Sequence, residues 1–346
     1  MKKSLIYIIL CIGVFLTAAF SLSMGAMKIP LQDVLFILAK KTGLFSNHTV
    51  NEQYETVLMI VRMPRVLMGL LIGAALGISG AAIQGIFRNP LAEPGLIGIS
   101  SGASLFAVLI IASEVSLFAG LGNLFGYYFL AFGSFVGAGI ATFVVYQISR
   151  SDGNPNVATM LLAGIAINAL AGALTGLVTY MANEQQLRNV TFWLLGSLGG
   201  ATWQIVLCLL PFILIPLAFL PMMGKTLNAF ALGETQAQQL GLPVGRAKRC
   251  VVILATMAVG ASVAVSGIIS FVGLLVPHMV RLIFGVDNRR VLPASALMGA
   301  IILTLADMIA RKLVAPVELP IGVVTALLGT PVFLYILIKD KKKIIR

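Results

Sequence analysis

The chain has 346 residues, of which 59% are hydrophobic and only 10% are charged, and its mean hydropathy is +1.02. A water-soluble domain cannot hide so much apolar surface, so these values exclude a soluble protein and require a lipid bilayer. The formal net charge is +12, but the basic residues gather at the ends of apolar segments, where they orient a membrane chain, so nucleic acid is not expected as a partner.

Apolar segments long enough to cross a bilayer recur along the whole chain. A transmembrane helix needs about 20 predominantly apolar residues, and this length is met about ten times between helix breakers. The sequence therefore predicts an all-α integral membrane protein with about ten transmembrane helices, in one domain over residues 1–346. The predicted spans are Ser4–Met24, Pro64–Phe87, Leu96–Ser113, Leu124–Ile148, Val157–Met181, Trp203–Met222, Cys250–Ile269, Phe271–Phe284, Leu292–Ala310 and Leu319–Ile338. The first resembles a signal peptide but is long for one, so it is expected to remain as an uncleaved span.

The distribution of lysine and arginine predicts the direction of these spans. Ten spans with a cytoplasmic N-terminus leave only eight of the 24 basic residues outside and place the Lys-rich tail inside, whereas nine spans would put that tail outside. Both termini are therefore expected in the cytoplasm. The eight outside residues are Lys28, Lys40, Lys41, Arg62, Arg65, Arg188, Arg311 and Lys312.

Residue types that hold metals or carry out catalysis occur without a supporting pattern. Cys11, Cys208 and Cys250 lie in or beside apolar runs, and neither they nor His48 and His278 have metal-ligand spacing. The cysteines are expected to be small hydrophobic residues, and no metal site is predicted.

Two short motifs resemble enzyme signatures but lack the required context. The stretch 98–102 fits the G-x-S-x-G elbow of hydrolases, yet it opens a membrane span rather than a strand-turn-helix unit. An intramembrane protease pairing Ser100 with His278 is a minor alternative to helix packing by small residues. Gly224-Lys-Thr226 resembles the end of a phosphate-binding loop, but Phe219 stands where that loop needs glycine. The chain is therefore not expected to be an enzyme or to hydrolyse ATP.

Glycines spaced four residues apart predict close packing between helices. They are Gly69, Gly73, Gly77, Gly133, Gly137, Gly172 and Gly176.

Two polar residues lie where a bilayer makes them costly. Asp307 falls within the ninth predicted span, where an unpaired carboxylate costs about 2.5–3.5 kcal/mol. Arg311 follows one helical turn later, so an ion pair between the two is expected to offset that cost. Asn168 shares a helix face with Gly164 and Gly172. Its amide either lines a transport pathway or bonds a neighbouring helix, and both alternatives stay open.

The longest cytoplasmic connection, about residues 225–249, has a helical composition of its own. Ala, Leu, Glu and Gln predict a short helix through Gln239, which Gly241 and Pro243 end. A plain linker needs no helix, so this segment is interpreted as a docking element for a cytoplasmic partner.

Several motifs resemble the FecCD-type permease family of binding-protein-dependent ABC importers, which carry ferric siderophores, haem and cobalamin. The resemblance covers nearly everything after the first span. The motifs are Arg62-Met-Pro-Arg65, Gly80-Ala-Ala-Ile-Gln84, Asn89-Pro-Leu-Ala-Glu-Pro-Gly95, Leu162-Ala-Gly-Ile-Ala-Ile-Asn168, Phe192-Trp-Leu-Leu-Gly196, Ala231-Leu-Gly-Glu234, Phe271-Val-Gly-Leu-Leu-Val-Pro-His278 and Glu318-Leu-Pro-Ile-Gly322.

The resemblance implies the type II ABC importer permease fold and a set of partners. These are a second copy of the chain, two cytoplasmic ATPase subunits that bind ATP and Mg²⁺, and one extracytoplasmic substrate-binding protein, assembled in a bacterial inner membrane. No cofactor is expected in the chain itself. By their match to the family, Arg62, Arg65 and Arg311 are expected to receive carboxylates of the binding protein, a role that suits the bidentate guanidinium group.

The same resemblance assigns a coupling segment and a gate. The coupling residues in contact with the ATPase are Leu232, Gly233, Glu234, Gln238, Leu240 and Gly241. The residues of the translocation path and gate are Val157, Ala158, Thr159 and Asn168.

The substrate is expected to be an iron chelate. Val157, Ala158 and Thr159 differ from the small hydroxyl pair of the cobalamin permeases, which disfavours cobalamin, the alternative substrate. The stretches 179–188 and 313–316 look most like the haem permeases, which favours haem over siderophores. An ion-driven secondary transporter is the rival class, but it would need more buried carboxylates than Asp307.

Overall fold

The computed structural model describes residues 3–25, 27–41, 51–113, 127–151, 154–314 and 317–344, and this part of the chain is almost wholly helical. Eight helices are long and apolar enough to cross a membrane, and two shorter apolar helices accompany them. The eight long helices are α1 (Lys3–Ser23), α4 (Met63–Phe87), α7 (Tyr127–Ile148), α8 (Val157–Met181), α10 (Trp203–Phe219), α13 (Val244–Ser266), α15 (Asn288–Lys312) and α16 (Ile321–Ile344). The two shorter ones are α5 (Ile99–Ser113) and α14 (Val272–Phe284). Each predicted span matches one of these helices, which confirms the multi-pass helical fold.

Short elements connect these helices. They are α2 (Leu31–Lys41), α3 (Glu52–Thr56), η1 (Val57–Arg62), η2 (Pro94–Ile97), α9 (Glu184–Leu195), η3 (Pro221–Met223), α11 (Gly224–Leu232), α12 (Glu234–Gln239) and the antiparallel two-residue strands β1 (Arg150–Ser151) and β2 (Asn154–Pro155).

Helix boundaries follow local signals where those are strong. Asn156 begins α8 at its predicted start because its side chain accepts hydrogen bonds from the amides of Ala158 and Thr159. The predicted break after the seventh span is also confirmed: α13 ends at Ser266, and Gly267 follows with a φ of +69°.

Other predicted boundaries are wrong. The second span does not begin at Pro64, because helical turns run unbroken from Glu52 through η1 into α4. The helix α9 lies between predicted spans and was not expected, although Asn183 and Gln186 form a capping box at its start. The predicted start of the fourth span, Leu124, lies outside the described residues.

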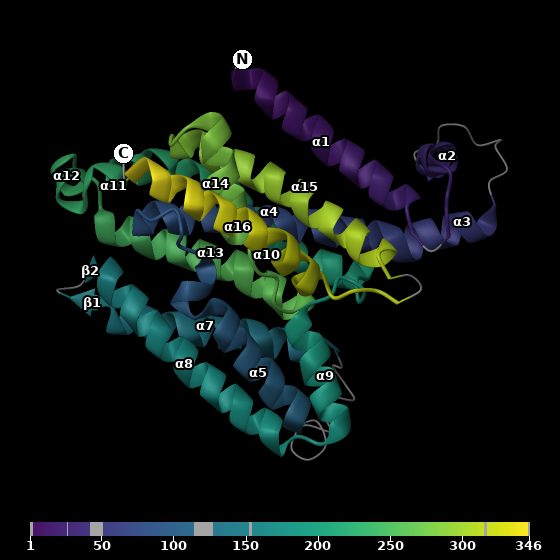
Figure 1. The fold of residues 1–346 in the computed structure, drawn as a ribbon, viewed down its shortest axis with the longest axis horizontal. Helices are drawn as coiled ribbons and strands as arrows, with labels where there is room; N and C mark the ends of the chain where they lie inside the picture. The colour runs from purple at the N-terminus through teal and green to yellow at the C-terminus, as the bar shows by residue number, and fades with distance from the viewer. Residues whose placement is uncertain are drawn as a thin grey trace.

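The bundle has two distinct ends, which Figure 1 shows. The helices α11 and α12, the strands β1 and β2 and the C-terminus lie at one end, called here the coupling end, and α2 and α3 lie at the other, called the outer end. The helix α4 runs through the middle and packs against α15, α14, α13 and α10. Of the most apolar stretch of the Glu52–Phe87 helix, 83% is buried, against 22% for α8. The core therefore surrounds α4, and α8 leaves most of its surface uncovered.

Glycines bring the backbone of α4 into contact with two neighbours. A Cβ on Gly73 would meet the backbone of Gly299 in α15, and one on Gly80 would meet the backbone of Gly273 in α14. The close packing predicted from Gly73 and Gly77 is thus confirmed. For Gly172 and Gly176 in α8 it is wrong among the described residues of one chain, because none of their atoms from outside that stretch of helix lies within 4 Å of the place a Cβ would take.

Candidate functional site

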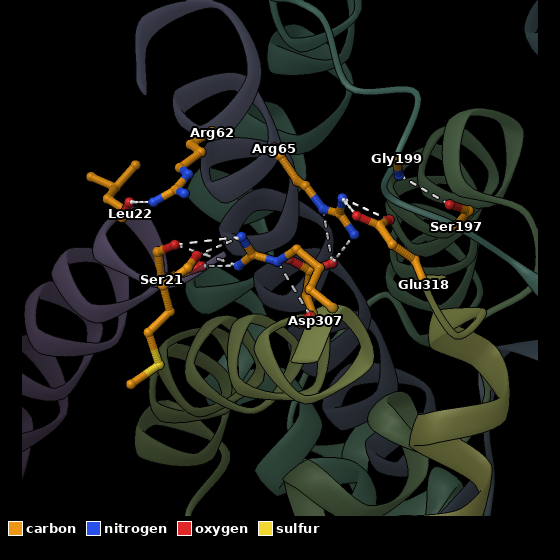
Figure 2. A network of polar contacts seen from close by, with 10 residues as sticks. Ser21, Leu22, Arg62, Arg65, Ser197, Gly199, Asp307 and Glu318 are labelled. Carbon is orange, nitrogen blue, oxygen red and sulfur yellow. Dashed lines mark hydrogen bonds and ion pairs between the residues drawn. The ribbon is translucent and has the colours of Figure 1, made fainter. Parts of the chain in front are cut away.

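Arg65 connects three elements at the outer end. It projects from the first turn of α4, and its Nη2 lies 2.9 Å from Asp307 Oδ1 in α15. Its Nη1 lies 2.9 Å from both carboxylate oxygens of Glu318, which precedes α16 (Figure 2). The side chains of Arg65 and Asp307 are 9% and 3% exposed, whereas that of Glu318 is 46% exposed. This guanidinium is therefore engaged on two sides within the chain.

Arg311 binds the other oxygen of Asp307. Its Nε lies 3.0 Å from Asp307 Oδ2, four residues earlier on α15, so the predicted ion pair is confirmed. Its terminal nitrogens donate to the hydroxyl of Ser21 at 2.6 Å and to the carbonyl of Met24 at 3.2 Å. Asp307 therefore faces two guanidinium groups, which offset the cost of burying it.

Arg62 is buried at the end of α1. Its Nη1 donates to the carbonyl of Leu22 at 2.6 Å (Figure 2). The same nitrogen donates to the carbonyl of Ser23 at 2.9 Å, and Nη2 donates to the carbonyl of Met27. The last carbonyls of a helix have no partner inside the helix and carry negative partial charge, so a guanidinium stabilises them. Gly25 leaves room for it, since a Cβ there would lie 2.7 Å from Arg62 Nη2.

The three arginines that the family resemblance assigns to docking are thus gathered at the outer end. Their guanidinium groups are bound by Asp307, by Glu318 and by the end of α1. The sequence pointed to the pair of Asp307 and Arg311, but it gave no sign that Arg65 and Glu318 join them. A partner's carboxylate would have to replace one of these internal partners.

At the coupling end, the predicted helix of the long connection is present but divided. The helix α11 ends at Leu232, and α12 runs from Glu234 to Gln239, as predicted for its end. Gly233 separates them with a φ of +126°, a conformation that glycine adopts without strain. The side chains of Leu232, Gln238 and Leu240 are exposed around α12. Exposed leucines beside a short helix are suited to contact with another protein.

Lys248 fixes α12 to the rest of the bundle. This lysine of α13 is 1% exposed, and its Nζ donates to Glu234 Oε2 at 2.6 Å and to the carbonyl of Pro155 in β2 at 2.8 Å. One ammonium group therefore joins the first residue of α12 to the strand that precedes α8. From the sequence, Lys248 counted only as one basic residue of a cytoplasmic cluster.

A second anchor fixes α11 to α15. The side chain of Asn228 donates to Asp287 Oδ1 at 2.7 Å and accepts from the backbone amide of Asn288 at 2.8 Å. Hydrogen bonds from the side chains of Arg289 and Asn228 lower the pKa of Asp287 to about 2. The carboxylate is therefore ionised at neutral pH, as this anchor requires.

The residues expected to form the gate lie directly beside residues expected to form the coupling segment. Val157, Ala158 and Thr159 form the first turn of α8. Val157 and Ala158 line a hollow of about 540 Å³ together with Gly233 and Glu234. The structure thus brings together two groups of residues that lie some 75 positions apart in the sequence.

Asn168 bonds its neighbours. Its Nδ2 donates to the carbonyl of Gly95 at 3.1 Å, and its Oδ1 accepts from the hydroxyl of Ser101 at 2.5 Å. Of the two roles left open for Asn168, the structure shows bonding to neighbours: its amide joins α8 to α5 and to the turn before α5. The G-x-S-x-G stretch lies in the first turns of α5, where Gly102 packs against Gly137 of α7, so its small residues serve helix packing.

The described chain is thus a multi-pass helical domain with a buried arginine network at one end and a short helix, anchored by Lys248, at the other, an arrangement that suits a transport permease. The model of the FecCD transport family matches residues 11–339, and the chain belongs to that family. It is thus an ABC importer permease, a class of subunit that is not itself an enzyme and that works with ATPase and substrate-binding partners.

Relatives with known roles cover most of the chain. The chain is 43% identical to the hemin transport system permease protein HmuU of Yersinia pestis, over 86% of its own length and 87% of that protein. It is 38% identical to the vitamin B12 import system permease protein BtuC of Salmonella paratyphi A, over 90% and 93%. A solved inward-facing ABC transporter of metal-chelate type has a TM-score of 0.83 and 30% identity, over 96% of this chain and 99% of that one.

Proposed function

We propose that this chain is the membrane-spanning subunit of an importer that moves an iron chelate, haem foremost, across a bacterial inner membrane. Two sequence observations support haem. The chain is 43% identical to a hemin permease, against 38–39% to cobalamin (vitamin B12) permeases. Its gate residues, Val157 to Thr159, also differ from the hydroxyl pair of the cobalamin permeases.

The proposed mechanism depends on the contact between Lys248, Glu234 and Pro155. An ATPase that binds the exposed leucines around α12 would move Glu234, and the buried ammonium of Lys248 would transmit that movement to β2 and the first turn of α8. The ammonium group is buried, although the Glu234 side chain is 34% exposed, and a hydrogen bond to a charged group contributes about 1.5–3 kcal/mol, which would help to keep the three groups together during the movement. ATP hydrolysis would thereby open or close the gate.

A second copy of the chain would complete the pathway. The helix α8 exposes large apolar side chains along its length, including Leu162, Ile165, Leu177 and Tyr180, and Gly172 and Gly176 have open space beside them. Paired small residues on an exposed helix face allow close approach of another helix. We assign this face to the interface between two copies and to the path between them.

The binding protein would dock at the outer end. Glu318 is the exposed member of the network there and holds Arg65 through both oxygens. A carboxylate of the binding protein would compete with Glu318 for that guanidinium, so docking and release would exchange one charged pair for another of similar energy. Arg311 and Arg62 would keep their internal partners and support Arg65.

The rival mechanism, transport driven by an ion gradient, is opposed by the state of Asp307. A carboxylate that binds and releases a proton or sodium ion has to lose its partners during the cycle. Asp307 is held at both oxygens by Arg65 and Arg311 and is 3% exposed.

Uptake by cells tests the substrate. Cells lacking the gene and cells with it restored are given labelled haem, a ferric siderophore or cobalamin. Loss of haem uptake alone, restored with the gene, is expected. Loss of cobalamin uptake alone would overturn the substrate assignment. Unchanged uptake of all three compounds would overturn the proposal that the chain imports iron chelates.

A further inference from the structure

A groove between α7 and α13 has no role in the proposed transport path. It encloses about 560 Å³, and its apolar walls include Phe135 and Phe143 of α7 and Val252 and Met257 of α13. The ring of Phe212 in α10 lies 5.0 Å from that of Phe135 and flanks the groove. No residue of α8 lines it. The groove therefore opens on a part of the bundle separate from the face assigned to the second copy.

Gly139 keeps this groove wide. Beyond its own stretch of helix, no described atom lies within 4 Å of the place where its Cβ would be, whereas the neighbouring Gly137 is packed against Gly102 and Phe106. A glycine within a helix costs about 1 kcal/mol relative to alanine, and at Gly137 close packing of the helices offsets that cost. At Gly139 no packing contact among the described residues offsets that cost. A ligand in the groove would give a physical reason for glycine at this position.

Two arginines lie at the end of the groove nearest the coupling end. The guanidinium of Arg249 stacks on the ring of Tyr146, 6.0 Å from its centroid, and its Nε donates to the Tyr146 hydroxyl at 3.2 Å. Arg150 donates to Gln147 at 3.2 Å. Both arginines are exposed. Among the described residues, which do not include Asp152, neither arginine has an ion pair and no acidic side chain lines the groove.

We propose that this groove binds one anionic phospholipid of the leaflet on the coupling side. An apolar trough in a membrane-facing surface fits an acyl chain, and a pair of guanidinium groups at its water-facing end fits a phosphate. Stacking on Tyr146 orients Arg249 in advance, so less side-chain entropy is lost when the phosphate binds. A free phosphate would use the arginines but leave the apolar walls empty.

Native mass spectrometry of the purified chain tests the site, with phosphatidylglycerol or phosphatidylcholine added at matched concentrations. The parent chain is expected to retain phosphatidylglycerol in preference. A basic residue near an anionic lipid surface contributes a factor of about five in binding, so Arg150→Gln with Arg249→Gln should weaken retention about thirtyfold. Gly139→Leu fills the groove and should displace the lipid without changing the charge.

Lys225→Gln is the matched control, because Lys225 is an exposed basic residue at the same end of the bundle that does not line the groove. It should retain phosphatidylglycerol as the parent does, and thermal unfolding of each variant confirms that it is folded. The proposal is overturned if the parent retains the two lipids equally, or if the double arginine variant retains phosphatidylglycerol as well as the parent does. It is also overturned if Lys225→Gln loses as much phosphatidylglycerol as the double variant, or if inorganic phosphate displaces the lipid.

Discussion

Arg65 Nη2 and Asp307 Oδ1 lie 2.9 Å apart across the contact between α4 and α15, although 242 positions separate the two residues in the chain. Both side chains are almost fully buried, and Arg311 binds the same carboxylate from the next turn of α15. Removing Asp307 takes one carboxylate from both arginines, and of the two only Arg65 keeps another, Glu318. The network therefore determines both how these helices pack and which substitutions the outer end tolerates.

Asp307→Ala should lower the free energy of unfolding by about 3–5 kcal/mol, because it leaves Arg311 as a buried charge without its ion-pair partner and Arg65 with only the half-exposed Glu318. Unfolding of the chain in mild detergent measures this change. The control Glu184→Gln removes an exposed carboxylate and should shift stability by no more than about 0.5 kcal/mol. Equal stability of Asp307→Ala and the parent would contradict the network.

Glu318→Gln should strengthen docking of the binding protein by up to about fivefold, since a half-exposed ion pair is worth about 0–1 kcal/mol and its loss frees one side of Arg65. Affinity of the binding protein for the chain in lipid nanodiscs measures this. Unchanged or weaker docking would show that Arg65 serves only the fold.

Lys248→Met should uncouple ATP hydrolysis from transport while the ATPase stays bound. Methionine fills the buried space but removes the link from Glu234 to Pro155, and losing a charged hydrogen bond of about 1.5 kcal/mol or more should reduce transport about tenfold or more. Reconstituted vesicles measure hydrolysis and uptake together. Arg246→Gln, an exposed basic residue near by on α13, should behave as the parent. Full coupling in Lys248→Met would refute the link.

Gly73→Ala should destabilise the chain by about 1–3 kcal/mol, because the new Cβ would lie 2.8 Å from the carbonyl carbon of Gly299 and neither backbone can move aside cheaply. Gly139→Ala is the matched control, in open space on another helix, and should be neutral or stabilising by up to about 1 kcal/mol. The same unfolding assay compares them, and similar losses in both would contradict the difference in packing.

Gly172→Leu should reduce the fraction of dimer without unfolding the single chain, since its side chain has room in one copy and would occupy the face assigned to the second. Mass measurement of the detergent-solubilised protein determines the oligomeric state. A dimer fraction equal to that of the parent would place the interface elsewhere.

Sequence reasoning succeeded where a signal is local. The apolar run that begins at Val157 predicts the start of α8, the break predicted after the seventh span falls near the end of α13, and the one-turn spacing of Asp307 and Arg311 predicts their pair. It failed where the partner is distant in the chain. Nothing near Arg65 indicates that Glu318, 253 positions later, completes its surroundings, and nothing near Lys248 indicates Pro155.

Glycines illustrate the same limit. Gly73 and Gly172 each belong to a pair spaced by four residues, so the sequence predicts the same packing role for both. In the structure Gly73 touches a neighbouring backbone, whereas a Cβ on Gly172 would meet no described atom of another element. Only the arrangement of the helices, and for Gly172 the state of assembly, distinguishes them.

The contacts of Gly73 with Gly299 and of Gly80 with Gly273 also restrict how the permease can change conformation. Side chains can change rotamer to let helices slide, but backbone atoms in contact cannot, so α4, α14 and α15 have to move as one rigid body. The helix α8 has few such contacts, with only 22% of its most apolar stretch buried. Alternation between inward-open and outward-open states is therefore expected to consist of movement of α8, driven at its first turn, against a central body that keeps its internal geometry.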